Sequence, residues 1–149
     1  MNVGIHCTRE VVITKPETEI RAAAKLMREC HVGDLVVVEH KDNENIPVGI
    51  LTDRDLVVEV LALDLNPETV TVADIMSFEP VTVSVEAGLF EALEQMRAKG
   101  IRRLLVVNKR GGLEGILTAD DVLELMGEAV GDLLALIKRE RTNEENRLR

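Results

Sequence analysis

Two short segments of the chain combine a hydroxyl and a carboxylate at the same spacing. The tetrapeptide Gly-Ile-Leu-Thr ends at Thr52 and again at Thr118, and an aspartate follows three residues later, at Asp55 and Asp121. At the start of a helix, a threonine hydroxyl and free backbone N–H groups face the same anion, which suits a phosphate. A carboxylate one turn further can accept hydrogen bonds from both hydroxyls of a ribose. A structural alternative stays open, in which the threonine caps the helix and the aspartate interacts with the helix dipole.

Two adjacent arginines, Arg102 and Arg103, stand at the start of a predicted strand. Two guanidinium groups suit a polyphosphate, because each can bind oxygens in a bidentate manner. The alternative is an ordinary pair of surface arginines, or an ion pair with a glutamate. The arginines and the two threonine–aspartate segments are therefore the candidates for anion binding in this chain.

The threonine–aspartate segment occurs twice because the chain contains an internal duplication. The second Gly-Ile-Leu-Thr follows the first by 66 residues, whereas upstream pairs such as Met27 with Met96 and Leu35 with Leu104 are 69 residues apart. The difference of three residues predicts a longer loop in the first copy, at residues 41–45, where an insertion is tolerated. Self-similarity of this kind indicates two copies of one supersecondary unit.

Each copy predicts the element order β-α-β-β-α. Apolar residues at helical spacing indicate amphipathic helices, and runs of β-branched residues indicate strands. The predicted strands are 11–14, 35–38, 48–51, 80–83, 104–107 and 113–117, and the helices that follow the two Gly-Ile-Leu-Thr segments are 56–65 and 122–138. A repeat that cannot bury both faces of its sheet is expected to pack on its copy. The predicted fold class is therefore α+β, with two β-α-β-β-α repeats packed with pseudo-twofold symmetry.

We expect three parts along the chain. Residues 1–66 form the first repeat with an N-terminal lead-in, residues 67–138 form the second repeat with a linker, and residues 139–149 form a polar tail. The tail is expected to be a frayed helix extension or disordered. Acidity is concentrated in the first half of the chain, since residues 1–75 carry a net charge of -7 and residues 76–149 carry -2.

Composition excludes several classes of protein. A net charge of -9 and only two aromatic residues disfavour a nucleic-acid surface, which needs a basic face and stacking platforms. No apolar stretch approaches the roughly 20 residues of a membrane span, and no signal peptide is visible. Cys7 and Cys30 are not patterned as a disulfide or zinc framework, so we expect a cytoplasmic protein with reduced thiols. The three histidines show no metal-ligand spacing and no nucleophile motif appears, so we expect no enzyme.

The duplicated pattern resembles a tandem pair of CBS (cystathionine-β-synthase) domains, the assembly called a Bateman module. The resemblance covers about Thr8 to about Met126. It rests on the two Gly-Ile-Leu-Thr-x-x-Asp segments, on residues 100–104 and on residues 72–76. It implies a regulatory module without catalysis, with two clefts between the repeats. The implied ligand is an adenine nucleotide (AMP, ADP or ATP, with Mg²⁺ accompanying ATP), and less often S-adenosylmethionine, NAD(H) or a divalent metal.

The resemblance also implies roles for individual residues. A basic residue contacts the phosphates at the position of Arg102 and Arg103, and the extended segments before the first helix of each repeat line the base or ribose. The predicted nucleotide-binding residues are Thr14, Lys15, Thr52, Asp55, Thr82, Arg102, Arg103, Thr118 and Asp121. Gly33 and Asp34 align with the arginines in the first copy, so a carboxylate stands where it would repel a phosphate. We therefore predict that the two clefts are not equivalent.

These features predict a module that senses an adenosyl nucleotide and modulates either a separate target protein or its own assembly. The resemblance implies a homodimer, since such modules commonly pair into a flat disc. The alternative from another class is a structural dimerisation or protein-interaction module whose clefts stay empty.

Overall fold

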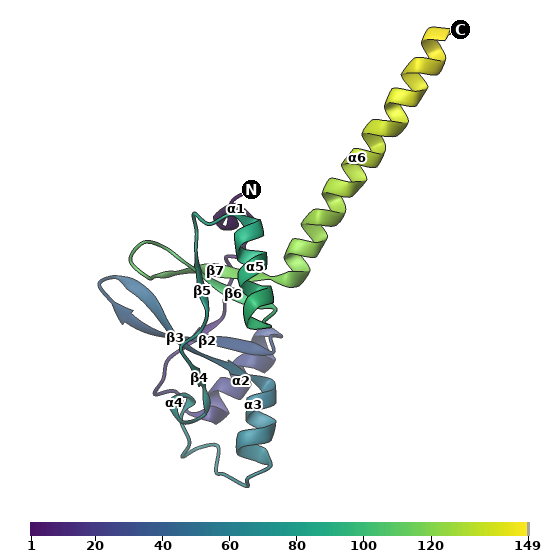
Figure 1. Cartoon of the computed structure of the whole chain (residues 1–149). Coiled ribbons are helices and arrows are strands. Elements are labelled where there is room, and N and C mark those ends of the chain that lie inside the picture. The colour runs from purple at the N-terminus through teal and green to yellow at the C-terminus, as the bar shows by residue number, and fades with distance from the viewer. Residues whose placement is uncertain (149) are drawn as a thin grey trace.

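The computed structural model describes residues 1–148. Figure 1 shows the helices and strands in a compact body from which one long helix projects. In chain order they are α1 (Val3–His6), β1 (Ile13–Thr14), α2 (Ile20–Cys30), β2 (Asp34–Lys41), β3 (Glu44–Thr52), α3 (Asp53–Leu56), the π-helical turn η1 (Val57–Leu61), α4 (Val72–Ile75), β4 (Ser77–Phe78), β5 (Thr82–Ser84), α5 (Leu89–Lys99), β6 (Arg103–Val107), β7 (Leu113–Thr118) and α6 (Ala119–Leu148).

The strands form two sheets of equivalent design. One sheet has the order β1-β2-β3-β4 and the other β5-β6-β7. In each sheet the first strand pairs in parallel with the second, which pairs in antiparallel with the third. A register shift interrupts both antiparallel pairs at aligned positions, between Val37 and Val38 and between Val106 and Val107. The predicted α+β class and the twofold β-α-β-β-α order are confirmed.

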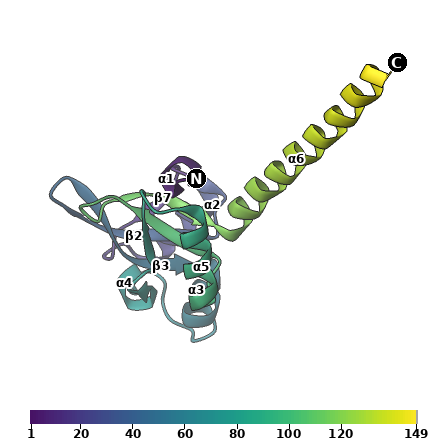
Figure 2. The same ribbon diagram turned by 45° about the horizontal axis from the view of Figure 1, so that its top comes forward.

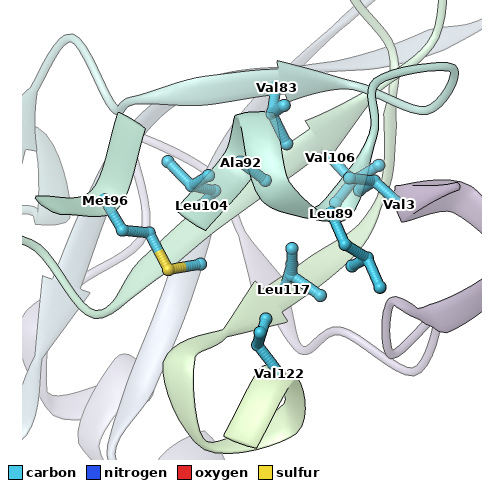
Figure 3. Packing of buried hydrophobic residues seen from close by; sticks show 9 residues of the cluster. All are labelled: Val3, Val83, Leu89, Ala92, Met96, Leu104, Val106, Leu117 and Val122. Atoms are coloured by element: carbon cyan, nitrogen blue, oxygen red, sulfur yellow. The ribbon is translucent and has the colours of Figure 1, made fainter. Parts of the chain in front are cut away.

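The two repeats exchange short segments. The N-terminal helix α1 packs on the second repeat, where Val3 is fully buried in the core shown in Figure 3. The linker between the repeats packs on the first, since Val72 and Met76 belong to the first core and β4 pairs with β3. Because of this exchange, a boundary in the sequence does not coincide with a boundary between the packed repeats. The division of the chain at residues 66/67 and 138/139 therefore remains a proposal.

The exchanged segments explain the glycine of each Gly-Ile-Leu-Thr segment. A Cβ on Gly49 would lie 2.7 Å from the carbonyl oxygen of Ser77, and a Cβ on Gly115 would lie 2.6 Å from that of Thr8. Thr8 and Ile116 also exchange two backbone hydrogen bonds of 2.9 Å. Glycine is therefore required because a neighbouring backbone crosses directly over the strand.

The loop predicted at residues 41–45 is wrong. Strand β2 continues to Lys41 and strand β3 begins at Glu44. Only Asp42 and Asn43 form the turn, and both have positive φ. Positive φ at both central residues is typical of a type I′ hairpin, which matches the twist of the strands. The three extra residues therefore lengthen a hairpin that reaches the second repeat.

The helices after Thr52 and Thr118 begin earlier than predicted. The first runs through α3 and η1, from Asp53 to Leu61, instead of 56–65, because the threonine caps it directly. The second is α6, which runs from Ala119 through Leu148 instead of ending at residue 138. The predicted tail is thus helical as far as Leu148, and Arg149 lies outside the described residues. Among residues 1–148 no helix is long and apolar enough to cross a membrane.

The two sheets pack against each other through a third core cluster of Val36, Val38 and Leu105. Two further clusters, one per repeat, lie between each sheet and its helices. Figures 1 and 2 show that α6 leaves this body and extends away from both sheets. The face-to-face packing brings equivalent strand ends of the two repeats together, which positions the candidate site.

Candidate functional site

One ion pair joins the two repeats at the start of their central strands. Asp34 begins β2 and Arg103 begins β6, and the Arg103 guanidinium pairs with the Asp34 carboxylate. Asp34 is the cross-strand partner of Thr52, and Arg103 is that of Thr118. The ion pair therefore brings both threonine–aspartate segments to one junction between the sheets.

Each threonine–aspartate segment forms a capping box. The Thr52 backbone N–H donates to Asp55 Oδ2 over 2.9 Å, and the Asp55 N–H donates to Thr52 Oγ1 over 3.1 Å. The same pair of bonds, both 3.1 Å, joins Thr118 and Asp121 at the start of α6. The structural alternative is thus realised in both repeats. The side chains of both threonines and both aspartates are half-buried at the junction.

A third capping box lies outside the junction. The Thr71 backbone N–H donates to Asp74 Oδ2 over 3.0 Å at the start of α4, in the linker. The sequence carries the same Thr-x-x-Asp spacing there, outside the two duplicated Gly-Ile-Leu-Thr segments. Capping alone therefore accounts for the spacing. What distinguishes Thr52 and Thr118 is their place beside Arg103.

The two arginines differ in their surroundings. Arg102 Nη2 donates to Asp120 Oδ1 over 2.6 Å at the surface, where both side chains are about three-quarters exposed. Arg103 is 45% exposed and its partner Asp34 is 27% exposed, so this pair is the more enclosed of the two. The ion pair considered for the arginines is present, with aspartates instead of glutamates as partners. Only Arg103 faces the other repeat.

Charge at the junction is asymmetric. In the first repeat, a Cβ on Gly33 would lie 3.1 Å from Asp53 Oδ2, so a carboxylate occupies the space beside the glycine. The aligned positions of the second repeat are Arg102 and Ala119. The first repeat therefore presents Asp34 and Asp53 where the second presents Arg103 and Ala119. An anion at this junction is attracted from one side and repelled from the other.

The remaining predicted site residues lie further along the strands. Thr14 is 7% exposed and pairs, from the edge strand β1, with Val37, three residues along β2 from Asp34. Lys15 lines a hollow of about 340 Å³ with His40, which stands six residues along β2 from Asp34, or roughly 20 Å. Thr82 is exposed and pairs with Leu105, two residues along β6 from Arg103, and its carbonyl accepts a 3.1 Å hydrogen bond from Gln95. Among the described residues no hydrogen bond or ion pair joins these three side chains to Asp34 or Arg103.

The N-terminal segment borders the second capping box. His6 shares a hollow of about 180 Å³ with Asp121, Glu124 and Glu128. Burial raises the pKa of the adjacent Cys7 thiol above 9.0, with Arg9 opposing the shift. Among the described residues no group of three or more His, Cys, Asp or Glu side chains could hold a metal ion. The side chains beside the second capping box can contact a ligand through hydrogen bonds and charge.

Sequence reasoning did not identify the pairing of Asp34 with Arg103. The alignment of the two copies contained the necessary information, because residues at equivalent positions meet across a pseudo-twofold axis when the copies pack face to face. The opposite charges of these aligned residues then predict attraction between the repeats as well as repulsion of a phosphate.

Comparisons with known proteins agree with this architecture. The family model described as CBS domain matches residues 3–62 and again residues 72–128. The uncharacterised protein MK0525 of Methanopyrus kandleri is 41% identical over 126 residues, which cover 84% of this chain and 62% of the relative. The chain thus spans less than two thirds of that relative's length.

Solved structures agree as well. The CBS-pair protein CBSX2 of Arabidopsis thaliana superimposes with a TM-score of 0.72 at 29% identity, covering 86% of this chain and 95% of that one. CBSX2 has also been solved in complex with AMP. The CBS domain protein PAE2072 of Pyrobaculum aerophilum, complexed with AMP, gives a TM-score of 0.70 at 27% identity, covering 85% and 99%. Two family-model matches on two packed β-α-β-β-α repeats show that this chain belongs to the CBS-domain family, as a tandem CBS pair.

Proposed function

We propose that the chain is a regulatory module that binds an adenine nucleotide at the Asp34–Arg103 junction. The observation that carries the proposal is the position of Arg103, a half-exposed guanidinium beside two capped helix starts, one from each repeat. Helix starts and a guanidinium favour phosphate oxygens, and Asp55 or Asp121 supplies a carboxylate for ribose hydroxyls. The AMP complexes of CBSX2 and PAE2072 support the ligand class.

Binding would compete with a contact inside the protein. A phosphate can engage Arg103 fully only when Asp34 releases it, because the carboxylate and the phosphate use the same donors. The Asp34–Arg103 pair joins the two repeats. A nucleotide therefore favours a different arrangement of the repeats from the one that the ion pair favours, which is the requirement for a ligand to shift a conformational equilibrium.

The same proposal covers the choice of ligand, the roles of the other predicted site residues, the location of the protein and its assembly. AMP, ADP and ATP (the last with Mg²⁺) share the adenosine and phosphate groups that the junction would recognise, whereas S-adenosylmethionine lacks a phosphate and NAD(H) is larger. Roles for Thr14, Lys15, Thr82 and Arg102 require a ligand that extends beyond the junction. We propose a cytoplasmic, non-catalytic homodimer that transmits the bound state to a target protein.

Calorimetric titration with AMP, ADP, Mg²⁺-ATP, S-adenosylmethionine and NADH tests the proposal. Removal of the guanidinium in R103A is expected to weaken binding of the preferred nucleotide by about 10–100-fold, the value of a charge-assisted hydrogen-bond pair. D34N is expected to tighten binding, since it removes both the competitor and the repulsion. D55N or D121N is expected to weaken it.

The matched control is D74N, which removes the same capping box in the linker, away from Arg103. Equal affinity in wild type and D74N is expected. Absence of heat with every ligand, or equal affinity in wild type and R103A, would refute nucleotide binding at this junction.

One observation favours the second candidate function, a module that binds protein. The first repeat carries an apolar hollow of about 320 Å³ between α2 and η1, and Leu61 at its edge is 71% exposed. A second copy is the occupant that fits the homodimer proposed above. If the wild type binds no nucleotide, and L61E converts a dimer into a monomer without changing the far-ultraviolet circular dichroism, the interaction function is favoured.

A further inference from the structure

Helix α6 continues far beyond the body that anchors it. Ala119, Val122, Leu125 and Met126 pack on the second core, whereas every residue from Val130 to Leu148 is exposed. Figures 1 and 2 show no other element beside this part. Isolated helices of this length are marginal in water and depend on packing of an amphipathic face. Gly127 and Gly131 weaken the helix further, so a covering partner is required.

Helix α6 carries an apolar seam at heptad spacing, which begins where Met126 still packs partly on the second core. Leu123, Met126, Val130, Leu133 and Ile137 follow one another at intervals of three and four residues. Leu123 is 72% exposed, Leu133 is 59% exposed and Ile137 is 47% exposed. This alternation places the side chains on one stripe about 21 Å long, the pattern by which one helix packs on another. The seam is thus shaped for a second helix.

The charges of α6 identify the second helix. All ionisable side chains between residues 119 and 137 are acidic: Asp120, Asp121, Glu124, Glu128 and Asp132. A basic cluster of Lys138, Arg139 and Arg141, interrupted by Glu140, follows immediately, and residues 138–148 carry a net charge of +1 against -5 for residues 119–137. An acidic polar face disfavours an anionic membrane surface. A second α6 running antiparallel sets each acidic half towards the other's basic cluster, whereas a parallel pair sets like against like.

We propose that α6 is a self-association element, which pairs in antiparallel orientation with α6 of a second copy through the seam of residues 123–137. The proposal stands independently of nucleotide binding, because the seam of residues 123–137 contains none of the junction residues. It assigns a role to the exposed part of the helix predicted at residues 122–138, and the start of the predicted polar tail supplies the basic residues.

Electron–electron distance measurements between spin labels test the proposal on the full chain. In a C7S/C30S background, one variant carries a label at Gly131→Cys, near the middle of the seam, and another at Asn146→Cys, near the helix tip. An antiparallel pair centred on residue 130, the middle of the seam, places the two Gly131 labels within about 25 Å and the two Asn146 labels about 50 Å apart. A parallel pair places both sets of labels close together.

Two double variants add the same charge on different faces. L133E/I137E introduces two carboxylates into the seam, and A135E/T142E introduces two on the outer face. L133E/I137E is expected to abolish both intermolecular distances and to raise the dissociation constant at least tenfold in sedimentation equilibrium. A135E/T142E is expected to retain the distances.

Three results would overturn the proposal. The first is a wild-type chain that stays monomeric at about 100 µM, a concentration at which a functional seam would be occupied. The second is a pair of distances that persists in L133E/I137E, which would mean that another surface mediates assembly. The third is a short distance between the Asn146 labels, which would mean parallel pairing.

Discussion

The two CBS repeats share one backbone design but differ in charge where they meet. Gly49 and Gly115 each pass beneath an exchanged segment, and Thr52 and Thr118 each cap a helix in the same way. Asp34 and Arg103 occupy equivalent positions yet carry opposite charges. The glycines and threonines of the Gly-Ile-Leu-Thr segments, which satisfy the backbone, are therefore the same in both copies, whereas Asp34 and Arg103, whose side chains meet across the junction, differ.

A similar difference appears at the end of the first helix of each repeat. Helix α2 ends on His31 and α5 ends on Gly100, and both residues are left-handed, with φ of 55° and 65°. Only glycine adopts this conformation without steric cost. The first repeat thus keeps a strained residue at a position where the second has the unstrained one.

The largest effect that would test the shared design concerns the glycines under the exchanged segments. G49A and G115A are each expected to lower the free energy of unfolding by about 2–4 kcal/mol, because the new Cβ meets a backbone carbonyl that cannot rotate away. Urea denaturation followed by circular dichroism measures this loss.

The control is G127A on α6, where a Cβ meets open space. It is expected to leave stability unchanged or raise it by up to about 1 kcal/mol. A loss below about 1 kcal/mol in G49A or G115A would mean that the exchanged segment moves away easily and does not complete the repeat.

The next effect concerns the capping boxes. T52A and T118A are each expected to lower the unfolding free energy by about 1 kcal/mol, since an N–H of the first turn loses its acceptor. In the linker the Thr71 hydroxyl instead donates to Asp74 Oδ2 over 3.1 Å, and the Asp74 N–H donates to the Thr71 carbonyl, so T71A is a control that removes no acceptor of a first-turn N–H. Equal losses in T52A and T118A with a smaller loss in T71A sharpen the comparison, whereas a gain in stability for T52A or T118A would indicate strain specific to the junction.

The strained helix end predicts a smaller change of opposite sign. H31G is expected to raise the unfolding free energy by about 0.5–1 kcal/mol, because glycine removes the steric cost of positive φ at the end of α2. G100A is expected to lower it by about 1 kcal/mol. Thermal unfolding of the two variants beside wild type gives both signs, and a destabilised H31G would assign the imidazole a compensating contact.

The smallest effect concerns pH and the N-terminal segment on the second repeat. Burial raises the pKa of the Cys7 thiol above its ordinary value of 9.0, so the folded chain holds this proton more tightly than the unfolded chain. The stability due to the neutral thiol is complete below pH 9 and is lost as pH rises through the raised pKa.

Between pH 8 and pH 10.5 the wild type is therefore expected to lose slightly more stability than C7S, in parallel urea titrations. C30S, which alters the exposed thiol, provides the matched control and is expected to follow the wild-type profile. Identical profiles for wild type and C7S would contradict the raised pKa.

Much of the fold could be predicted from local pattern. The strands beginning near Leu35 and Leu104 lie where β-branched runs placed them, and the duplicated order is present. The hairpin tip was mispredicted because Asp42 and Asn43 can form either a loop or a tight turn. The extended hairpin is held against the second repeat by a 3.1 Å hydrogen bond from Asn108 to Glu44, two residues that are 64 positions apart in sequence.

The candidate site was predictable in its residue types and less so in its arrangement. Thr52, Thr118 and Arg103 meet at one junction, while Lys15 follows β1 and shares a hollow with His40, six residues along β2 from Asp34. The spacing Thr-x-x-Asp also occurs at Thr71, where no junction exists. Local spacing therefore predicts a capped helix start, and only the packing of the two sheets makes two of the three starts neighbours of an arginine.

The sequence by itself determined the duplicated β-α-β-β-α unit, its capped helices and its acidic balance, because periodicity, capping and charge are properties of neighbouring residues. The tertiary structure decided which segments complete which repeat and which of the charged residues pair across the junction. These contacts join residues that are distant in sequence, such as Thr8 with Ile116 and Asp34 with Arg103, and chain closure on that scale leaves no trace in local pattern.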